Sequence, residues 1–164
     1  MRKVVANTTP LIALTNTGHL NLLREHYGEI LIPQAVMDEI KSEPAKSAVE
    51  QSDWIKVCSI ADDSPKKLFR ARLHAGEVEV MILAGEINAD LLIIDDNAAK
   101  KTAKYLGMNV TGTLGVLLRA KREGRLTAVK PVLAALRADG MFISDEIVSY
   151  VLKEAGETVY TIRQ

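Results

Sequence analysis

Short apolar runs alternate with amphipathic stretches along most of the chain. The apolar runs that read as strands lie at 3–6, 29–33, 54–60, 90–95 and 109–112. Between them, apolar residues recur at helical spacing over 10–15, 18–26, 33–43, 63–73, 76–88 and 96–106. The runs EILIP and DLLIID are continuously apolar, which is typical of parallel strands covered on both faces. This alternation predicts an α/β fold of three layers, α/β/α, with a central, mainly parallel sheet.

The C-terminal part of the chain is predicted to be helical. Its helical stretches lie at about 113–123, 128–138 and 144–154. Gly124 and Gly140 suit the ends of the first two helices, and Ser144 suits the start of the third. We therefore expect a single domain over 1–164 with extra C-terminal helices over about 113–154.

Composition narrows the class of protein without pointing to a ligand. Lys plus Arg and Asp plus Glu both total 21 in 164 residues, so the net charge indicates neither nucleic acid nor membrane. The single cysteine, Cys58, excludes an intramolecular disulfide and fits a reducing cytosol, and we expect it to be a buried strand thiol. No apolar stretch is long enough to span a bilayer, and MRKVVANTTP lacks the features of a signal peptide. These features predict a soluble, cytoplasmic protein without membrane contact.

Acidic residues follow the predicted strand DLLII, at the sheet edge where ligands of α/β folds bind. Asp96 or Asn97 is expected to cap the following helix by accepting hydrogen bonds from its free N–H groups. A second acid along the strand axis is less easily explained by capping, and hard oxygen ligands are what Mg²⁺ or Mn²⁺ requires. No GxxxxGK[ST] or GxGxxG pattern occurs, and the three histidines have no zinc-like spacing, which disfavours nucleotide folds and zinc sites.

Two glutamates on predicted helices extend this acidic set. On a helical wheel Glu77 falls in the middle of an apolar arc, whereas Glu79 and Glu86 fall on the opposite side, towards solvent. A buried carboxylate is costly unless it is paired, protonated or metal-bound, but a glutamate in a first helical turn is also favoured by the helix dipole. Glu39 borders an apolar stripe, where ordinary surface acids are common. The wheel leaves both interpretations of Glu77 open, and by itself it favours an ordinary surface acid at Glu39.

A parallel sheet could bring Glu39, Glu77 and Asp95 to one edge. Three or four converging carboxylates would hold one or two Mg²⁺ ions. Such ions lower the pKa of a water and stabilise the leaving oxygen of a phosphodiester.

Three motifs resemble those of PIN domains, specifically prokaryotic PIN-related proteins with a DTSPLI start, a GE-x-EA helix and a GTLGVL segment. In this chain they read NTTPLI (7–12), GEVEV (76–80) and GTLGVL (112–117). The resemblance covers nearly the whole chain. It implies an α/β/α nuclease that cuts single-stranded RNA with Mg²⁺ or Mn²⁺ held by acidic residues. Many members of the family are the toxin of a toxin–antitoxin pair.

The resemblance also implies a set of site residues. The family's acids fall on Asn7, Glu39, Glu77 and Asp95, with Asp96 as a close alternative to Asp95, and Thr9 matches a hydroxyl near the metal. The amide of Asn7 is a neutral and poorer ligand than a carboxylate, so we predict weaker Mg²⁺ binding and slower hydrolysis. A change made to silence a toxic nuclease and a natural loss or alteration of activity would both explain Asn7.

The resemblance implies partners as well: single-stranded RNA, a second copy in a homodimer, and a small antitoxin protein. Lys100 and Lys101 are the basic residues best placed to contact phosphate, and further cations lie at Lys66, Lys67, Arg70, Arg72, Lys104, Arg119, Lys121, Arg122 and Arg125. Few aromatic side chains are present for base stacking. The tail 158–164 alternates like a strand and could add to a sheet edge.

Two other functions remain open at this point. The first is a catalytically silent PIN-like module that binds RNA or protein; the presence of Glu39, Glu77 and Asp95 argues against it, since a dead site need not keep them. The second is a receiver-like phosphoacceptor, suggested by IIDD, although receivers carry their paired acids after the first strand rather than a late one.

Overall fold

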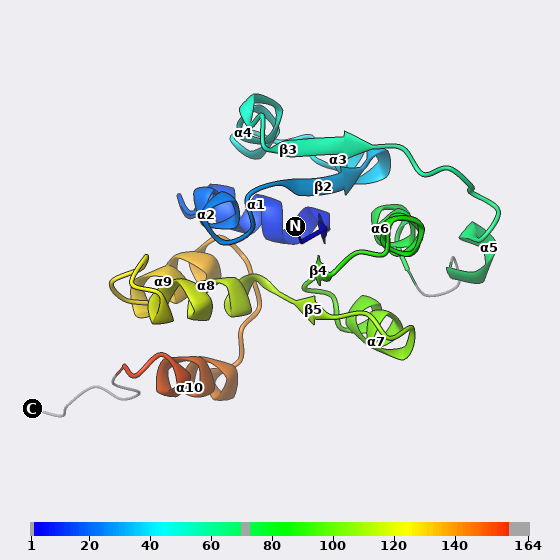
Figure 1. Ribbon diagram of the computed structural model, residues 1–164. Coiled ribbons are helices and arrows are strands. Elements are labelled where there is room, and N and C mark those ends of the chain that lie inside the picture. Colours follow the sequence, from blue (N-terminus) through cyan, green and yellow to red (C-terminus); the bar gives the residue numbers. More distant parts are fainter. Residues whose placement is uncertain (1, 70–72, 158–164) are drawn as a thin grey trace, which may run out of the picture. The chain divides into compact units, whose positions relative to one another are not determined.

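The computed structural model describes residues 2–69 and 73–157, and Figure 1 shows its helices and strands. Arg70, Arg72 and the tail 158–164, for which the sequence suggested functions, lie outside the described residues. The chain forms two compact units, 1–113 and 114–164. That 1–164 is one domain stays a prediction.

The first unit is built on a five-stranded parallel sheet with the order β3-β2-β1-β4-β5. Its strands are β1 (Val4–Ala6), β2 (Ile30–Pro33), β3 (Ile55–Cys58), β4 (Leu91–Ile93) and β5 (Val110–Thr111). Its helices are α1 (Thr8–Asn16), α2 (Asn21–Tyr27), α3 (Gln34–Glu39), α4 (Ala45–Gln51), α5 (Lys66–Phe69), α6 (Ala75–Ile87) and α7 (Asn97–Tyr105). The predicted strands are all present, and the prediction of a parallel α/β fold is confirmed.

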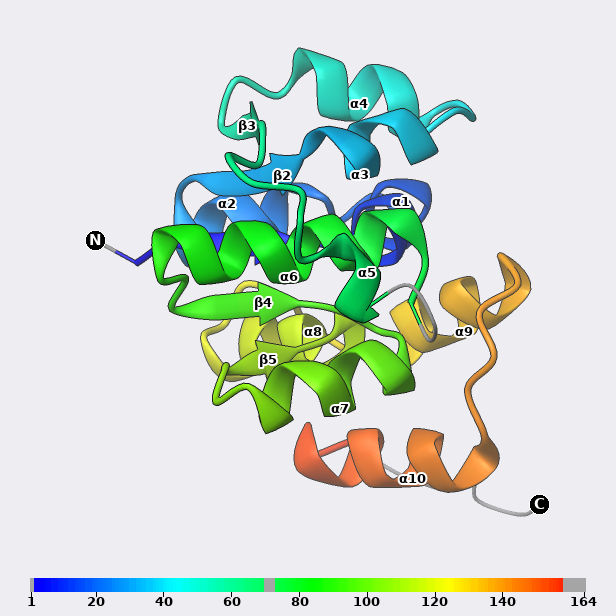
Figure 2. The same ribbon diagram turned by 90° about the vertical axis from the view of Figure 1, so that its right-hand side faces the viewer.

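Helices cover both faces of this sheet. Figures 1 and 2 show α6 and α7 on one face and α2 on the other. The central strand β1 is completely buried, which explains its unbroken apolar run. At the sheet edge β3 leaves Lys56 and Val57 exposed. Cys58 at the end of this edge strand is consequently half-buried, so the expectation of a buried thiol was wrong.

The sequence pattern missed one helix and misplaced the bounds of others. Helix α4 buries only Ala45 and Val49, so its apolar stripe is too short to give a clear helical period. The helix predicted over 63–73 begins later, as α5 at Lys66, and its predicted residues 70–72 lie outside the described part of the chain. The helix predicted over 33–43 is shorter, because α3 ends at Glu39.

The helices of the second unit are α8 (Thr113–Arg122), which begins at the last residue of the first unit, α9 (Lys130–Ala138) and α10 (Asp145–Glu154). Gly124 and Gly140 follow α8 and α9 with positive φ angles of 75° and 104°, as helix-ending glycines do. The Ser144 hydroxyl accepts a hydrogen bond from Ile147 N–H at 3.2 Å and caps α10, as predicted.

Glu157 anchors the start of α9 within this unit. Its carboxylate accepts hydrogen bonds from the N–H groups of Val129 (2.6 Å) and Lys130 (3.0 Å) and from the ammonium of Lys121 (3.1 Å). Burial alone would raise the pKa of Glu157, but these three hydrogen bonds and the Lys121 charge outweigh burial and lower the pKa. The negative charge therefore contributes to the stability of the second unit.

Among the described residues, no helix is both long and apolar enough to cross a membrane. A cytoplasmic location stays a prediction.

Candidate functional site

The carboxyl ends of β1 and β4 lie side by side. Ala6 is in register with Ile93, and the Asn7 N–H donates to the Ile93 carbonyl at 2.9 Å. The chain leaves β1 for β2 on one side, whereas β4 is added on the other side, so the strand order reverses between β1 and β4. Ligands of open α/β sheets bind at such a reversal. Asn7 follows β1 and Asp95 follows β4 closely, which places both at this point.

The side chain of Asn7 is buried without a hydrogen-bond partner for its oxygen. Asn7 is 4% exposed, and its Oδ1 receives no hydrogen bond from the described part of the chain. The residue stands at the N-cap position of α1, yet its side chain does not cap that helix. Leaving a buried polar atom unpaired costs about 1–3 kcal/mol. The Asn7 oxygen is therefore available to a ligand.

Glu77 is buried in the first turn of α6. It is 7% exposed, as its position in the apolar arc predicted, and its Oε1 accepts a hydrogen bond from His74 N–H at 3.0 Å. Burial raises the pKa of Glu77, and the negative charges of Asp96 and Glu39 raise it further, against the opposing effects of His74. Asp96 and Glu39 are thus each close enough to Glu77 to repel its negative charge.

Glu39 at the end of α3 is held by two other helices. Its Oε1 accepts a hydrogen bond from the Thr8 hydroxyl at 2.6 Å, and its Oε2 accepts one from Gly76 N–H at 3.1 Å. A Cβ atom at residue 76 would lie 2.2 Å from Glu39 Oε1. The glycine of the GEVEV motif therefore makes room for an acid from another element, and sequence reasoning missed this role.

The two aspartates after β4 have different hydrogen-bond partners. Asp96 is the N-cap of α7, and its Oδ2 accepts from Ala99 N–H at 2.9 Å, which confirms the predicted cap. Asp95 accepts two hydrogen bonds from Thr113, from its N–H at 2.8 Å and from its hydroxyl at 2.6 Å. The GTLGVL match was a signal for Thr113, but only the structure shows that Thr113 contacts an acid.

Of two expectations about side chains near the site, one stays a prediction and one needs correction. Thr9 is exposed, and the hydroxyl that contacts Glu39 belongs to its neighbour Thr8, so a place for Thr9 near a metal stays a prediction. Glu79 was expected to face solvent, but it accepts a hydrogen bond from Ala35 N–H at 3.1 Å and forms an ion pair with Lys66 at 3.2 Å. This error arose because α3 packs against α6 on the side that the wheel assigned to solvent.

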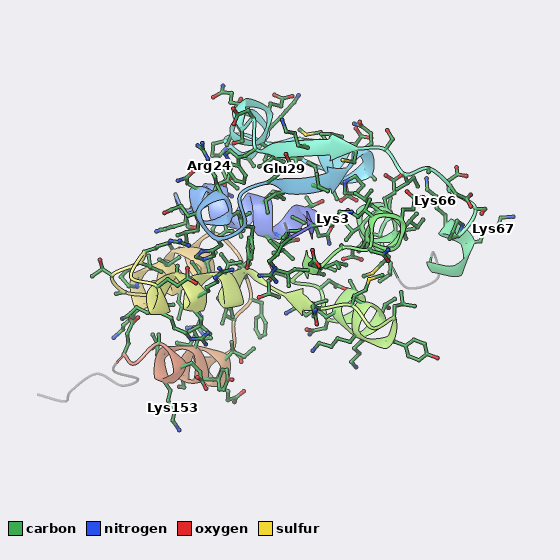
Figure 3. All side chains as sticks on the ribbon, viewed as in Figure 1. Lys3, Arg24, Glu29, Lys66, Lys67 and Lys153 are labelled. Carbon is green, nitrogen blue, oxygen red and sulfur yellow. The ribbon has the colours of Figure 1, made fainter. Side chains whose placement is uncertain are left out.

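The predicted basic residues differ in their exposure and in their ion pairs. On α7, Lys100 is half-buried beside Gly112, and Lys101 is exposed. Figure 3 shows Lys66 and Lys67 on the α5 side of the first unit, with Lys67 pointing outward. In the second unit, ion pairs engage Arg119, Lys121 and Arg125.

The acids at this edge fit a divalent cation, although they do not form a closed cage. Within residues 2–69 and 73–157, no three His, Cys, Asp or Glu side chains are grouped closely enough to hold a metal ion. Mg²⁺ usually retains several waters and binds through one or two carboxylates together with substrate phosphates, so it does not need such a cage. The unpaired oxygen of Asn7 and the repulsion of Glu77 by Asp96 and Glu39 are both features that a cation would relieve.

A family model described as a PIN domain matches residues 3–157. The chain belongs to the PIN-domain family. Membership of this nuclease-like family agrees with the parallel α/β sheet and with the acids at its carboxyl edge, and it leaves the receiver-like alternative without support. No curated protein matches the sequence.

Proposed function

We propose that this PIN domain is a metal-dependent endoribonuclease that hydrolyses phosphodiester bonds of single-stranded RNA, with activity weakened by Asn7. The observation that supports this proposal best is the environment of Glu77. This carboxylate is buried, its pKa is raised, and it lies near Glu39 and Asp96 beside the strand-order reversal. Such an arrangement is unfavourable without a cation and is typical of functional sites.

Mg²⁺ or Mn²⁺ would be held by Asn7, Glu39, Glu77 and one of the two adjacent acids, Asp95 or Asp96. When bound, the ion supplies an activated water and charge stabilisation for the leaving oxygen. The protein's own contribution is orientation. Thr8 and Gly76 hold the carboxylate of Glu39 through hydrogen bonds of 2.6 and 3.1 Å. Lys100 and Lys101 on α7 supply positive charge for an RNA phosphate.

Asn7 supports a second candidate function, a catalytically silent module that binds RNA or protein. An amide at this position removes one negative charge from the site, and its oxygen has no partner in the described structure.

Under the nuclease proposal, the chain acts as the toxin of a toxin–antitoxin pair in the cytoplasm, as a homodimer that binds a small antitoxin.

The decisive experiment restores the family's acid. The chain, Asn7→Asp and Asn7→Asp with Glu77→Gln are incubated with single-stranded RNA in Mn²⁺, with EDTA as the metal-free control. Asn21→Asp makes the same chemical change at an exposed residue that begins α2 and serves as the matched variant. We expect Asn7→Asp to cut RNA faster than the parent chain, and Asn21→Asp to leave the rate unchanged.

Loss of cutting in the double variant would tie the activity to Glu77. If the parent chain itself cuts, Glu77→Gln is also made in the parent chain, and loss of cutting in that variant would show that the amide is tolerated. Failure of every variant on a substrate panel that includes structured RNA would overturn the nuclease proposal. Metal-independent RNA binding by the parent chain would then favour the silent module.

A further inference from the structure

The adjacent carboxylates Asp95 and Asp96 leave the same strand, but the protein engages them to different extents. Both oxygens of Asp95 accept a hydrogen bond from Thr113, Oδ1 at 2.8 Å and Oδ2 at 2.6 Å. Thr113 is completely buried, so its hydroxyl has no access to water and depends on Asp95 as its acceptor. The Asp95 carboxylate is therefore fixed in direction by a bidentate contact with one residue.

The surroundings of Asp95 also contain a cation and a tight steric fit. A Cβ atom at Gly112 would lie 2.6 Å from Asp95 Oδ1 and 3.1 Å from the Lys100 ammonium nitrogen, so both groups border the same small space. An ammonium group beside Asp95 repels a divalent cation and disfavours metal binding there. Asp95 is thus already provided with hydrogen-bond donors and a neighbouring positive charge.

Asp96 has surroundings different from those of Asp95. It stands at the N-cap of α7 and shares no hydrogen bond with Thr113 in the described structure. Its Oδ2 caps α7, and no described residue donates a hydrogen bond to its Oδ1. Glu77 is similar, because the described structure donates one hydrogen bond to its Oε1 and none to its Oε2. Asp96 and Glu77 each keep one carboxylate oxygen free for a ligand.

We propose that Asp96 is the metal-facing acid of the pair, and that Asp95 is a structural acid which ties the end of β4 to Thr113. This assignment rests on the proposed function. It gives the GTLGVL motif a role within the first unit: Gly112 leaves room for the Asp95 carboxylate, and Thr113 binds both of its oxygens. The metal-facing oxygens are then those of Asn7, Glu77 and Asp96, which the described residues leave free.

The test measures the Mn²⁺ dissociation constant, by electron paramagnetic resonance of free Mn²⁺, together with the melting temperature in EDTA. Both are measured for Asp95→Asn, Asp96→Asn, Thr113→Val and Glu77→Gln, in the parent chain and in Asn7→Asp. We expect Asp96→Asn to weaken Mn²⁺ binding by about tenfold or more. Its metal-free melting temperature should not fall, because Asn caps helices as well as Asp does. Asp95→Asn and Thr113→Val should lower the melting temperature and change the Mn²⁺ constant by less than about threefold.

The opposite ranking, with Mn²⁺ binding lost in Asp95→Asn and kept in Asp96→Asn, would overturn the assignment. Equal losses in both aspartate variants would also overturn it, and Thr113→Val gives an independent measure if Asp95→Asn does not fold. Glu77→Gln distinguishes a failure of the Asp96 assignment from a failure of the proposed metal site. Loss of Mn²⁺ binding in Glu77→Gln but not in Asp96→Asn rejects only the assignment. Unchanged binding in Glu77→Gln, or no binding in any background, rejects the metal site of the proposed function.

Discussion

Replacing Glu77 by Gln should make the metal-free protein more stable at neutral pH. The substitution keeps the size of the side chain and an Oε1 that can accept the 3.0 Å hydrogen bond from His74 N–H. It removes a negative charge that is 7% exposed and that lies near the charges of Asp96 and Glu39. Because the charge is unfavourable where it stands, its removal should stabilise the folded state.

The pH dependence of this effect follows from the raised pKa of Glu77. The folded protein holds the Glu77 proton more tightly than the unfolded chain does. Stability therefore falls as the pH rises from the ordinary glutamate pKa, about 4.3, to the raised folded value, and it stays lower above that value. Glu77→Gln has no such proton to lose. The stability difference between the two proteins should be small below the ordinary pKa and complete above the raised pKa.

We expect the free energy of unfolding of Glu77→Gln to exceed that of the parent chain by about 1–2 kcal/mol at neutral pH, because the substitution neutralises a buried carboxylate with one hydrogen bond and two acidic neighbours. In a protein of this size, such a difference raises the melting temperature by about 3–6 °C. The assay is thermal unfolding in EDTA at pH 4 and pH 7.5. Glu79→Gln on the same helix is the matched control, because Glu79 is paired with Lys66 and Ala35 N–H and its loss should destabilise.

Adding Mn²⁺ at neutral pH should make the melting temperature of the parent chain higher than that of Glu77→Gln. A metal ion stabilises the folded state to which it binds, so Mn²⁺ should raise the melting temperature of the parent chain more than that of Glu77→Gln. The reasoning would be refuted if Glu77→Gln were less stable than the parent chain in EDTA at pH 7.5. A stability difference that did not change between pH 4 and pH 7.5 would refute it equally.

Two further substitutions test other contacts. Gly76→Ala should displace the Glu39 carboxylate, since the new Cβ would lie 2.2 Å from its Oε1, and denaturant unfolding should show a loss of about 1 kcal/mol. Gly85→Ala on the same helix meets no atom within 4 Å and should instead stabilise by about 0.4–1 kcal/mol, and equal effects would contradict the steric argument. Glu157→Gln should cost about 2 kcal/mol at pH 7. Because the pKa of Glu157 is lowered, the parent chain should lose this stability as the pH falls below the ordinary glutamate value, and a pH-independent cost would count against a role for the charge.

Sequence reasoning predicted the features that depend on neighbouring residues. The strands and most helices follow from hydrophobic periodicity, and the burial of Glu77 follows from its place on the α6 wheel. The cap of α7 by Asp96 is also a local interaction, between residues three apart in the sequence. Each of these features is determined within one turn or one strand, where pattern and propensity carry the information.

The features that sequence reasoning missed depend on contacts between separate elements. The Gly76 N–H reaches Glu39 across 37 residues, and Thr113 reaches Asp95 across 18. The half-buried position of Glu79 likewise depends on the packing of α3 against α6. No periodicity within one helix encodes which neighbour will cover it, so these contacts required the folded structure.

These contacts give the acids Glu39 and Asp95 a structural reason to be present. Glu39 and Asp95 were taken as signs of activity because a dead site need not keep them. In the structure Glu39 joins Thr8 to Gly76, and Asp95 satisfies the buried hydroxyl of Thr113, so a silent protein would keep both for stability. Glu77 differs, because its charge is unfavourable in the metal-free fold. A chain that no longer bound a metal ion would gain stability by losing this carboxylate. The presence of Glu77 therefore supports a working metal site more strongly than the number of acids does.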